Sequence, residues 1–309
     1  MKKWFLLLLT VWSTASFAKV INFEIKFNPF VGNPATEDNV KSVAGKASVF
    51  LNNVLISEQE VQSRDQPVLF EAREIGTEVW LPMASLGPLL RQGKNTVRIE
   101  FAPTDATMPY RTQLSWAEVN DQSTETQSEG GFAATNQSGE GKDIKDAQGK
   151  ATMEREFSAD FAADLPWHHA PAITALGDDD KQQLLKLVND RAEQFTPKFE
   201  GLYKILAMPH PGIELDLAQI RKSGCLDKAH KAGVRIAARS LDQMAFVLSG
   251  RQEIVVKGKG DALYPLKPEN FAKIKGDETQ MCAGMALSIA YPPQLIVVKN
   301  AAGAWEVIF

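Results

Sequence analysis

The spacing of apolar residues changes part-way along this chain of 309 residues. Between Ile21 and Phe27, apolar residues alternate with polar ones, a period typical of a strand with one buried face. After residue 178, apolar residues recur at intervals of three and four, as on one face of a helix. The sequence therefore predicts two domains, an all-β sandwich over residues 19–165 and an α+β domain over residues 166–309.

The predicted sandwich consists of short strands separated by turns. Asn52 and Asn53 lie between two of these strands and suit a tight hairpin, because asparagine tolerates a positive φ. Many short strands with frequent turns are typical of a β-sandwich. We expect strands at Ile21 to Phe27, Lys46 to Leu51, Val54 to Ile56, Val68 to Ala72, Glu78 to Leu81, Thr96 to Phe101, Arg111 to Val119 and Thr152 to Ser158.

One segment of the first half resembles an element of galactose-binding-like jelly-roll domains. From Leu89 to Ile99, an apolar turn leads through a Gly-x-Asn into an alternating strand. Glycine supplies the backbone freedom that such a corner requires, so the strand's apolar residues, through Phe101, would face inward. Val49-Phe50-Leu51-Asn52-Asn53 also lies where that family has a strand and its turn. The resemblance implies a jelly-roll fold and does not imply sugar binding.

Residues 120–150 are almost entirely small or polar, with Phe132 and Ile144 as the only large apolar side chains. Such a segment buries too little apolar surface to offset the entropy lost on ordering. We expect a disordered loop within the sandwich, because the alternation from Met153 to Phe157 indicates a returning strand. A linker between the two domains is the alternative.

Three helices are expected after the sandwich. Asp178 is a favourable N-cap, and acidic residues follow it in the first turn. Gly224 is placed to end the third helix. The helices are expected from Asp178 through Phe195, from Pro197 through Leu206, and from Leu215 through Lys222.

An antiparallel sheet is expected to follow these helices. Ser249-Gly250 suits a hairpin, and Pro292-Pro293 marks a bend. Helices before a sheet, closing on Gly303-Ala304-Trp305-Glu306-Val307, resemble the nuclear-transport-factor-like cone fold over residues 175–309. The expected strands are Met244 to Leu248, Glu253 to Lys257, Met285 to Tyr291, Gln294 to Lys299 and Trp305 to Phe309.

The first eighteen residues have the order of a secretory signal peptide. Lys2 and Lys3 precede an apolar run from Trp4 to Trp12, and small residues around Ala18 suit cleavage. The apolar run is far shorter than the roughly twenty residues that span a bilayer. We therefore expect a soluble periplasmic or secreted protein without a membrane span.

Charge argues against nucleic acid as a partner. Loss of Lys2 and Lys3 with the signal peptide would change the net charge from −4 to −6. Proteins that bind nucleic acid carry basic patches that neutralise phosphates. This acidic balance mainly reports on solubility.

The chain contains two cysteines, Cys225 and Cys282. An exported protein enters an oxidising compartment, where such a pair can form a disulfide bond. We predict that bond. Two buried free thiols are the alternative, and neither cysteine lies in a reactive context such as Cys-x-x-Cys.

The segment from His210 to Asp216 holds the candidates for catalysis. It brings together His210, Glu214 and Asp216, and a histidine with two carboxylates can transfer a proton or bind a metal. Glu214 and Asp216 are equally well explained as first-turn acids that complement a helix dipole.

A second histidine pair, His168 and His169, follows Pro166-Trp167. Adjacent side chains of an extended segment point to opposite sides, so a metal there would need ligands from elsewhere. The plainer interpretation is that Trp167 anchors the connection between the domains by burying its indole.

The sequence contains no Walker loop, no Gly-x-Ser-x-Gly and no complete EF-hand loop. We therefore expect a non-catalytic binding protein of the cell envelope, without metal or cofactor, whose partner is an envelope protein or a glycan. Two alternatives are an immunity protein that neutralises a secreted antibacterial toxin, and an enzyme that uses a pocket of the C-terminal domain. The cone fold commonly encloses a pocket, whose expected lining also suits an ordinary core: Phe199, Tyr203, Met244, Phe246, Met285 and Trp305.

Overall fold

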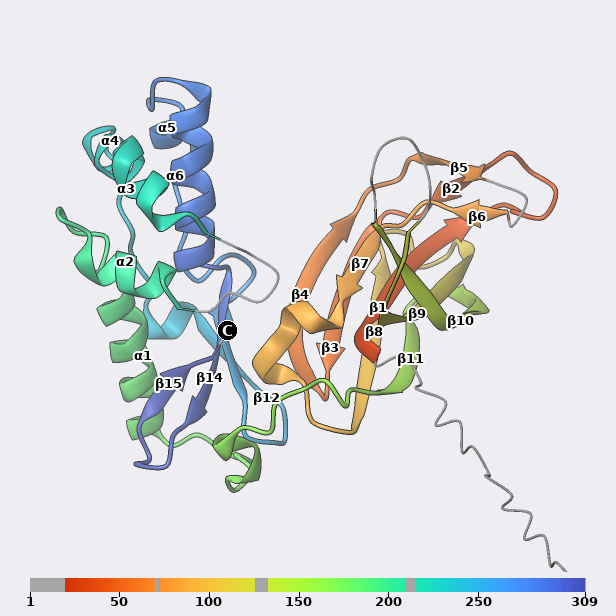
Figure 1. Ribbon diagram of the computed structural model, residues 1–309, viewed down its shortest axis with the longest axis horizontal. Helices are drawn as coiled ribbons and strands as arrows, with labels where there is room; N and C mark the ends of the chain where they lie inside the picture. The colour runs from red at the N-terminus through yellow and green to blue at the C-terminus, as the bar shows by residue number, and fades with distance from the viewer. Residues whose placement is uncertain (1–19, 70–72, 126–132, 209–214, 309) are drawn as a thin grey trace, which may run out of the picture.

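The computed structural model describes residues 20–69, 73–125, 133–208 and 215–308. The expected signal peptide lies outside these ranges, as does Phe309 at the end of the last expected strand. The described chain combines antiparallel sheets with helices, and strands predominate in its first half (Figure 1). This arrangement agrees with the β-rich mixed fold that the sequence predicts. The division into two domains at residue 165 stays a prediction.

The larger sheet of the first half has seven strands. Its order is β10-β9-β1-β2-β5-β6, and β7 pairs with β1 beside β2. Alternating apolar residues form β1, as the sequence predicts. The strands are β1 (Val20–Val31), β2 (Asn39–Ser42), β5 (Asp65–Leu69), β6 (Glu74–Ile75), β7 (Val79–Pro82), β9 (Pro109–Glu125) and β10 (Ala133–Gln148).

A four-stranded sheet of order β11-β8-β3-β4 packs against the larger sheet. Asn52 and Asn53 form the predicted hairpin between β3 and β4, with φ angles of 52° and 69°. Gly93 (φ 81°) makes the predicted corner before β8. The strands are β3 (Gly45–Leu51), β4 (Val54–Val61), β8 (Lys94–Pro103) and β11 (Ala151–Ser158), and the 3-10 helix η1 (Met83–Leu89) precedes β8.

Aromatic side chains join the two sheets across one apolar core. The ring of Phe23 stacks on that of Phe157 at 4.3 Å, and the rings of Phe27 and Phe101 lie 6.0 Å apart. Val97, Ile99 and Phe101 of β8 are buried in this core, as the alternation of that strand predicts. Even-numbered residues of β1 therefore face away from the core.

The prediction of a disordered loop over residues 120–150 is wrong for the described part of that segment. β9 continues to Glu125, and β10 pairs with it in an antiparallel hairpin from Ala133 to Gln148. Backbone hydrogen bonds to a neighbouring strand order such a segment without large apolar side chains. Residues 126–132 lie outside the described ranges.

The second half contains a sheet of order β12-β13-β14-β15 with helices (Figure 1). Its strands are β12 (Met244–Leu248), β13 (Ile254–Gly258), β14 (Gln294–Lys299) and β15 (Trp305–Val307). Its helices are η2 (Pro166–His169), α1 (Asp178–Ala192), α2 (Glu200–Leu206), α3 (Leu217–Ser223), α4 (Cys225–Lys231), η3 (Leu241–Gln243), α5 (Pro268–Phe271) and α6 (Asp277–Ala290).

The ends of the first two helices differ from those expected. The N-cap of α1 is Gly177 rather than Asp178, and the carboxylate of Asp180 accepts a hydrogen bond from the Gly177 N–H. Lys198 and Phe199 have positive φ angles of 82° and 52°, which a helix cannot contain. α2 therefore begins at Glu200 instead of Pro197.

The expected strand from Met285 to Tyr291 is wrong, because these residues belong mostly to helix α6. The buried residues of α6 are Ala283, Ala286, Leu287 and Ala290, a spacing of three and four. A short apolar run suits either a buried strand or a helix, and here the residues on its N-terminal side extend the helical pattern. Helices α5 and α6 thus lie between β13 and β14, and the predicted order of all helices before the sheet does not hold.

The sulfur atoms of Cys225 and Cys282 lie 2.12 Å apart, at the distance of a disulfide bond. Cys225 begins α4 and Cys282 lies in α6, so the bond joins two helices that are 57 residues apart in sequence. The sequence predicts this pairing.

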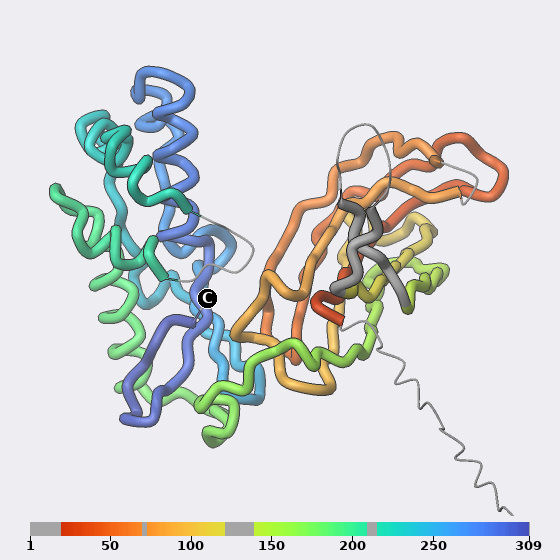
Figure 2. Tube along the Cα trace, viewed as in Figure 1, coloured from red at the N-terminus to blue at the C-terminus, as the bar shows by residue number. Residues whose placement is uncertain are grey.

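The C-terminal sheet contacts the strands of the first half. After β11 the chain crosses from the first half to the second once (green in Figure 2). Val255 of β13 and Ile296 of β14 are buried in the same apolar cluster as Val54 and Leu55 of β4. The side-chain N–H of Gln294 donates to the Leu55 carbonyl at 2.8 Å. This contact holds β4 against the C-terminal sheet. The C-terminal sheet does not cover the face of the seven-stranded sheet that points away from the apolar core (Figure 1).

Among the described residues, no helix is both long enough and apolar enough to cross a membrane.

Candidate functional site

The outer face of the seven-stranded sheet carries a continuous set of polar side chains. On β1 the odd-numbered residues from Phe23 to Phe27 are buried in the core, so Glu24, Lys26 and Asn28 lie on the opposite face. The same alternation that builds the core therefore places charged and amide groups together on the outside.

The strand register extends this polar face over β9 and β10. Lys26 pairs with Ser115 of β9, which pairs with Lys142 of β10. Two residues further along β1, Asn28 pairs with Gln113 of β9. Residues paired directly across an antiparallel ladder share one face of the sheet, so these side chains are neighbours.

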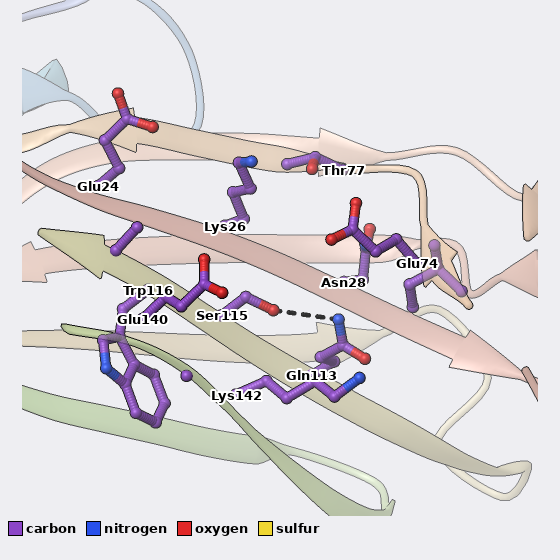
Figure 3. Close-up of a pocket in the computed structure, with 13 residues that line it drawn as sticks. Glu24, Lys26, Asn28, Glu74, Thr77, Gln113, Ser115, Trp116, Glu140 and Lys142 are labelled. Carbon is purple, nitrogen blue, oxygen red and sulfur yellow. Dashed lines mark hydrogen bonds between the residues drawn. The ribbon is translucent and has the colours of Figure 1, made fainter. Parts of the chain in front are cut away.

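These side chains surround a cavity of about 370 Å³. Figure 3 shows the side chains of Glu24, Lys26 and Glu140 on one side of the strands. It also shows the Ser115 hydroxyl, which accepts from the Gln113 amide at 3.1 Å. The turn between β6 and β7 closes one end of the cavity. Its lining residues are Glu24, Lys26, Asn28, Glu74, Ile75, Thr77, Gln113, Ser115, Trp116, Ala117, Glu140, Gly141 and Lys142.

Asn28 shapes the cavity wall and is not free to bind a ligand. Its side-chain oxygen accepts from the backbone N–H of Glu78 at 2.8 Å, and its amide donates to the Gly76 carbonyl. Only 5% of Asn28 is exposed. Both hydrogen bonds hold the turn between β6 and β7, which carries Thr77, against β1.

Trp116 forms part of the cavity from beneath the sheet. Its indole points away from the side on which Glu24 and Lys26 lie (Figure 3), and the Arg155 guanidinium stacks on it at 3.8 Å. Gly141 of β10 lies over the ring, and a Cβ atom at that position would approach the Trp116 ring to 2.5 Å. Glycine is therefore required at 141 for this close packing.

The cavity combines charges of both signs. Glu24, Glu74 and Glu140 supply carboxylates, and Lys26 and Lys142 supply ammonium groups. Within the described part of the chain, we find no ion pair for any of the five. Their hydrogen-bonding capacity is available to a ligand that carries both donors and acceptors.

Of the catalytic candidates of the sequence, the structure describes Asp216 alone. His210 and Glu214 lie outside the described residues. Asp216 is the N-cap of α3, and its carboxylate accepts from the Gln219 N–H at 2.9 Å. Of the two interpretations of Asp216, helix capping is the one that this geometry explains.

The expected lining of a C-terminal pocket is mostly core. Phe199, Tyr203, Met244 and Trp305 are buried in the apolar cluster of the second half, and Phe246 is half-buried against it. Met285 instead lies on the outside of α6 with 46% of its surface exposed. The structure thus brings five of the six together by packing and leaves Met285 apart, and their role as a ligand pocket stays a prediction.

His168 and His169 have different surroundings. The side chain of His168 is only 3% exposed; its Nε2 donates to the Pro88 carbonyl at 3.0 Å and its Nδ1 accepts from the Leu165 N–H. His169 is 70% exposed and contacts the Asp164 carboxylate at 2.8 Å. Among the described residues, no group of three or more histidine, cysteine, aspartate or glutamate side chains is arranged to hold a metal ion.

Stability is expected to fall on mild acidification because of His168. Burial holds the pKa of His168 below its ordinary value of 6.5, so the folded protein keeps the ring neutral. Unfolding then takes up a proton below about pH 6.5, and the free energy of unfolding declines as the pH falls from there toward the folded pKa. Urea unfolding between pH 7.5 and 5.5 measures this decline.

The variant His168→Gln retains a donor toward Pro88 but does not titrate, so we expect its stability to depend less on pH than that of the wild type. His169→Gln changes the neighbouring, exposed ring and is the comparison variant. Equal pH profiles of stability for the wild type and His168→Gln would contradict the assignment of this pH dependence to His168.

Comparisons with protein-family models, with curated proteins and with solved structures found no match to this chain. The resemblances to the jelly-roll and cone families therefore stay predictions of fold. The site described above rests on the geometry of this chain alone.

Sequence reasoning did not find the cavity on the outer face. Its signal was present in the polar members of the alternation along β1, at Glu24, Lys26 and Asn28. Such residues usually form an ordinary solvated face. The register that brings β9 and β10 beside them depends on the hairpin that composition argued against.

Proposed function

We propose that this chain is an exported, non-catalytic binding protein of the cell envelope, and that the outer-face cavity is its ligand site. The observation that carries the proposal is the mixed polar lining of that cavity, in which ammonium and carboxylate groups without an ion pair among the described residues lie beside amide and hydroxyl groups on neighbouring strands of one sheet. Sites on strands hold their groups more firmly than sites on loops.

The chemistry of the lining favours a glycan as the ligand. Sugar hydroxyl groups both donate and accept hydrogen bonds, so they match a surface that offers Lys26 and Lys142 as donors and Glu24 and Glu140 as acceptors. A polyanion would be repelled by the carboxylates, and a polycation would be repelled by the lysines. A hydroxyl-rich, uncharged ligand avoids both repulsions.

The envelope location is supported by two features. The first eighteen residues have the charge and apolar order of a signal peptide. The cysteine pair at disulfide distance suits an oxidising compartment. We propose that the chain acts there after cleavage near Ala18.

The proposed organisation has two domains that divide at residue 165. Its support is the pair of large buried clusters, one mainly between the sheets of the first half, which Val255 and Ile296 of the C-terminal sheet also join, and one around the C-terminal sheet and helices. In this organisation the N-terminal β-sandwich carries the glycan site. No specific observation among the described residues favours the immunity-protein or enzyme alternatives.

Loss of two polar contacts in the cavity is expected to weaken glycan binding. The double variant Lys26→Ala, Gln113→Ala removes an ammonium and an amide from neighbouring strands. Hydrogen bonds to charged groups contribute about 1.5–3 kcal/mol, so we expect affinity to fall about ten- to hundredfold. The affinities of the wild type and the double variant, each purified from residue 19 onward, are measured on an array of envelope and plant oligosaccharides.

Lys186→Ala is the matched control, because it removes an ammonium that is 74% exposed on α1, away from the cavity. It should bind as the wild type does. The proposal fails if the wild type binds no glycan on the array, or if the double variant binds as strongly as the wild type.

A further inference from the structure

An exposed tryptophan lies directly beside the cavity. In β7, Val79 pairs with the buried Phe27, and Trp80 pairs with Lys26, which lines the cavity. Trp80 therefore shares the outer face with Lys26, and 55% of its surface is exposed. Tryptophan is usually well buried, and this residue leaves most of a large apolar ring in contact with solvent.

Trp80 and the cavity residues form one row across four strands. The pairs run from Trp80 of β7 to Lys26 of β1, then to Ser115 of β9 and Lys142 of β10. Three spacings between neighbouring strands amount to about 14 Å. A single sugar ring is too short to contact both ends of this row, whereas several linked rings span it.

We propose that Trp80 forms a stacking subsite continuous with the cavity, and that the ligand is an oligosaccharide chain lying across β7, β1, β9 and β10. This inference rests on the proposed glycan-binding function. An indole presents a flat apolar face to the C–H groups of a pyranose ring, while the neighbouring Lys26 and Ser115 offer hydrogen bonds to its hydroxyl groups.

An extended peptide fits this row less well than a glycan. A peptide that adds to a sheet binds the free backbone groups of an edge strand. Here β1 and β9 are interior strands whose backbones pair on both sides, while β7 and β10 each pair with one strand. The row runs across all four strands and not along a free edge, so it offers side chains instead of backbone. The mixed charges beside Trp80 also favour a neutral chain over an acidic or basic one.

Dependence on chain length tests the inference. The probe is an array of neutral β-1,4-linked glucose and N-acetylglucosamine oligomers of one to six residues. We expect wild-type binding to rise with length, and Trp80→Ala to lose about tenfold or more of its affinity for the hexamers while its binding of the shortest bound oligomer is unchanged. Trp80→Phe keeps an aromatic face and should recover part of the loss.

Two controls keep the result interpretable. Leu248→Ala truncates another exposed apolar side chain, 37% exposed on β12, and should bind as the wild type does. Thermal unfolding of Trp80→Ala should match that of the wild type, because the ring is mostly solvated.

The outcomes separate the inference from the function on which it rests. If the wild type binds no oligomer of either series, the inference is overturned, and the wider glycan array still decides the proposed function. If Trp80→Ala binds hexamers as the wild type does, the Trp80 subsite is overturned and the cavity proposal survives. If Trp80→Ala keeps glycan binding but loses an envelope peptide bound by the wild type, the occupant is a peptide and the inference is wrong.

Discussion

Replacing Glu253 by alanine is expected to lower the free energy of unfolding by about 3–5 kcal/mol. Glu253 is fully buried next to β13, and its carboxylate pairs with the Arg91 guanidinium, whose side chain is 12% exposed. Burial lowers the pKa of Arg91, and the Glu253 charge opposes this effect. Without the carboxylate, the guanidinium keeps its desolvation cost and loses its counter-charge.

The position of this pair adds a second consequence. Arg91 precedes β8 in the first half of the chain, Glu253 lies in the hairpin between β12 and β13, and the Trp167 ring stacks on Arg91 at 4.7 Å. The ion pair thus joins the strands of the first half to the C-terminal sheet. We expect Glu253→Ala to expose Trp167 to solvent, which shifts its fluorescence to longer wavelength.

Urea unfolding of the wild type and the variant measures the change in stability. Glu156→Ala is the matched control, because the Lys94–Glu156 pair has side chains that are 71% and 57% exposed. Exposed pairs contribute little, so this control should change stability by less than about 1 kcal/mol. Similar small effects for both variants would show that the Arg91–Glu253 pair does not bear on stability.

The double variant Cys225→Ser, Cys282→Ser is expected to lose about 4 kcal/mol of unfolding free energy. The bond closes a loop of 57 residues between α4 and α6, and the unfolded chain gains entropy when that loop is released. Cys225 is fully buried, so a serine there also places a hydroxyl in an apolar cluster.

Chemical denaturation with and without dithiothreitol separates these two contributions. The reductant should lower the denaturation midpoint of the wild type and leave that of the double variant unchanged. A wild type whose thiols are titrated as reduced but whose midpoint does not move would contradict a stabilising disulfide.

Local patterns predicted the parts of the fold that depend on neighbouring residues. The hairpin at Asn52-Asn53 and the corner at Gly93 follow from residue types that accept a positive φ. The inward side of β8 follows from its alternation, and the end of α3 at Gly224 follows from the C-cap preference of glycine. Each of these features is decided within a few residues along the chain.

Three errors arose where the deciding feature is a contact distant in sequence, an ambiguous pattern or a backbone conformation. The polar strand β10 is ordered by its hydrogen-bond ladder with β9, and the composition of a segment does not show which strand it will pair with. The apolar run after Met285 suits a strand or a helix, and packing of α6 against its neighbours decides for the helix. The start of α2 lies at Glu200 and not at Pro197, because the positive φ angles at Lys198 and Phe199 leave no signature in residue type.

The amino-acid sequence by itself determined the period of each strand, the inward and outward faces of β1 and β8, and the availability of two cysteines for one bond. Only the tertiary structure decided that Glu24, Lys26 and Trp80 meet Ser115 and Lys142 on one surface. Alternation assigns each side chain to a face of its own strand, but a ligand site needs the order and register of several strands. That order depends on hydrogen bonds and core packing between segments that are far apart in the chain.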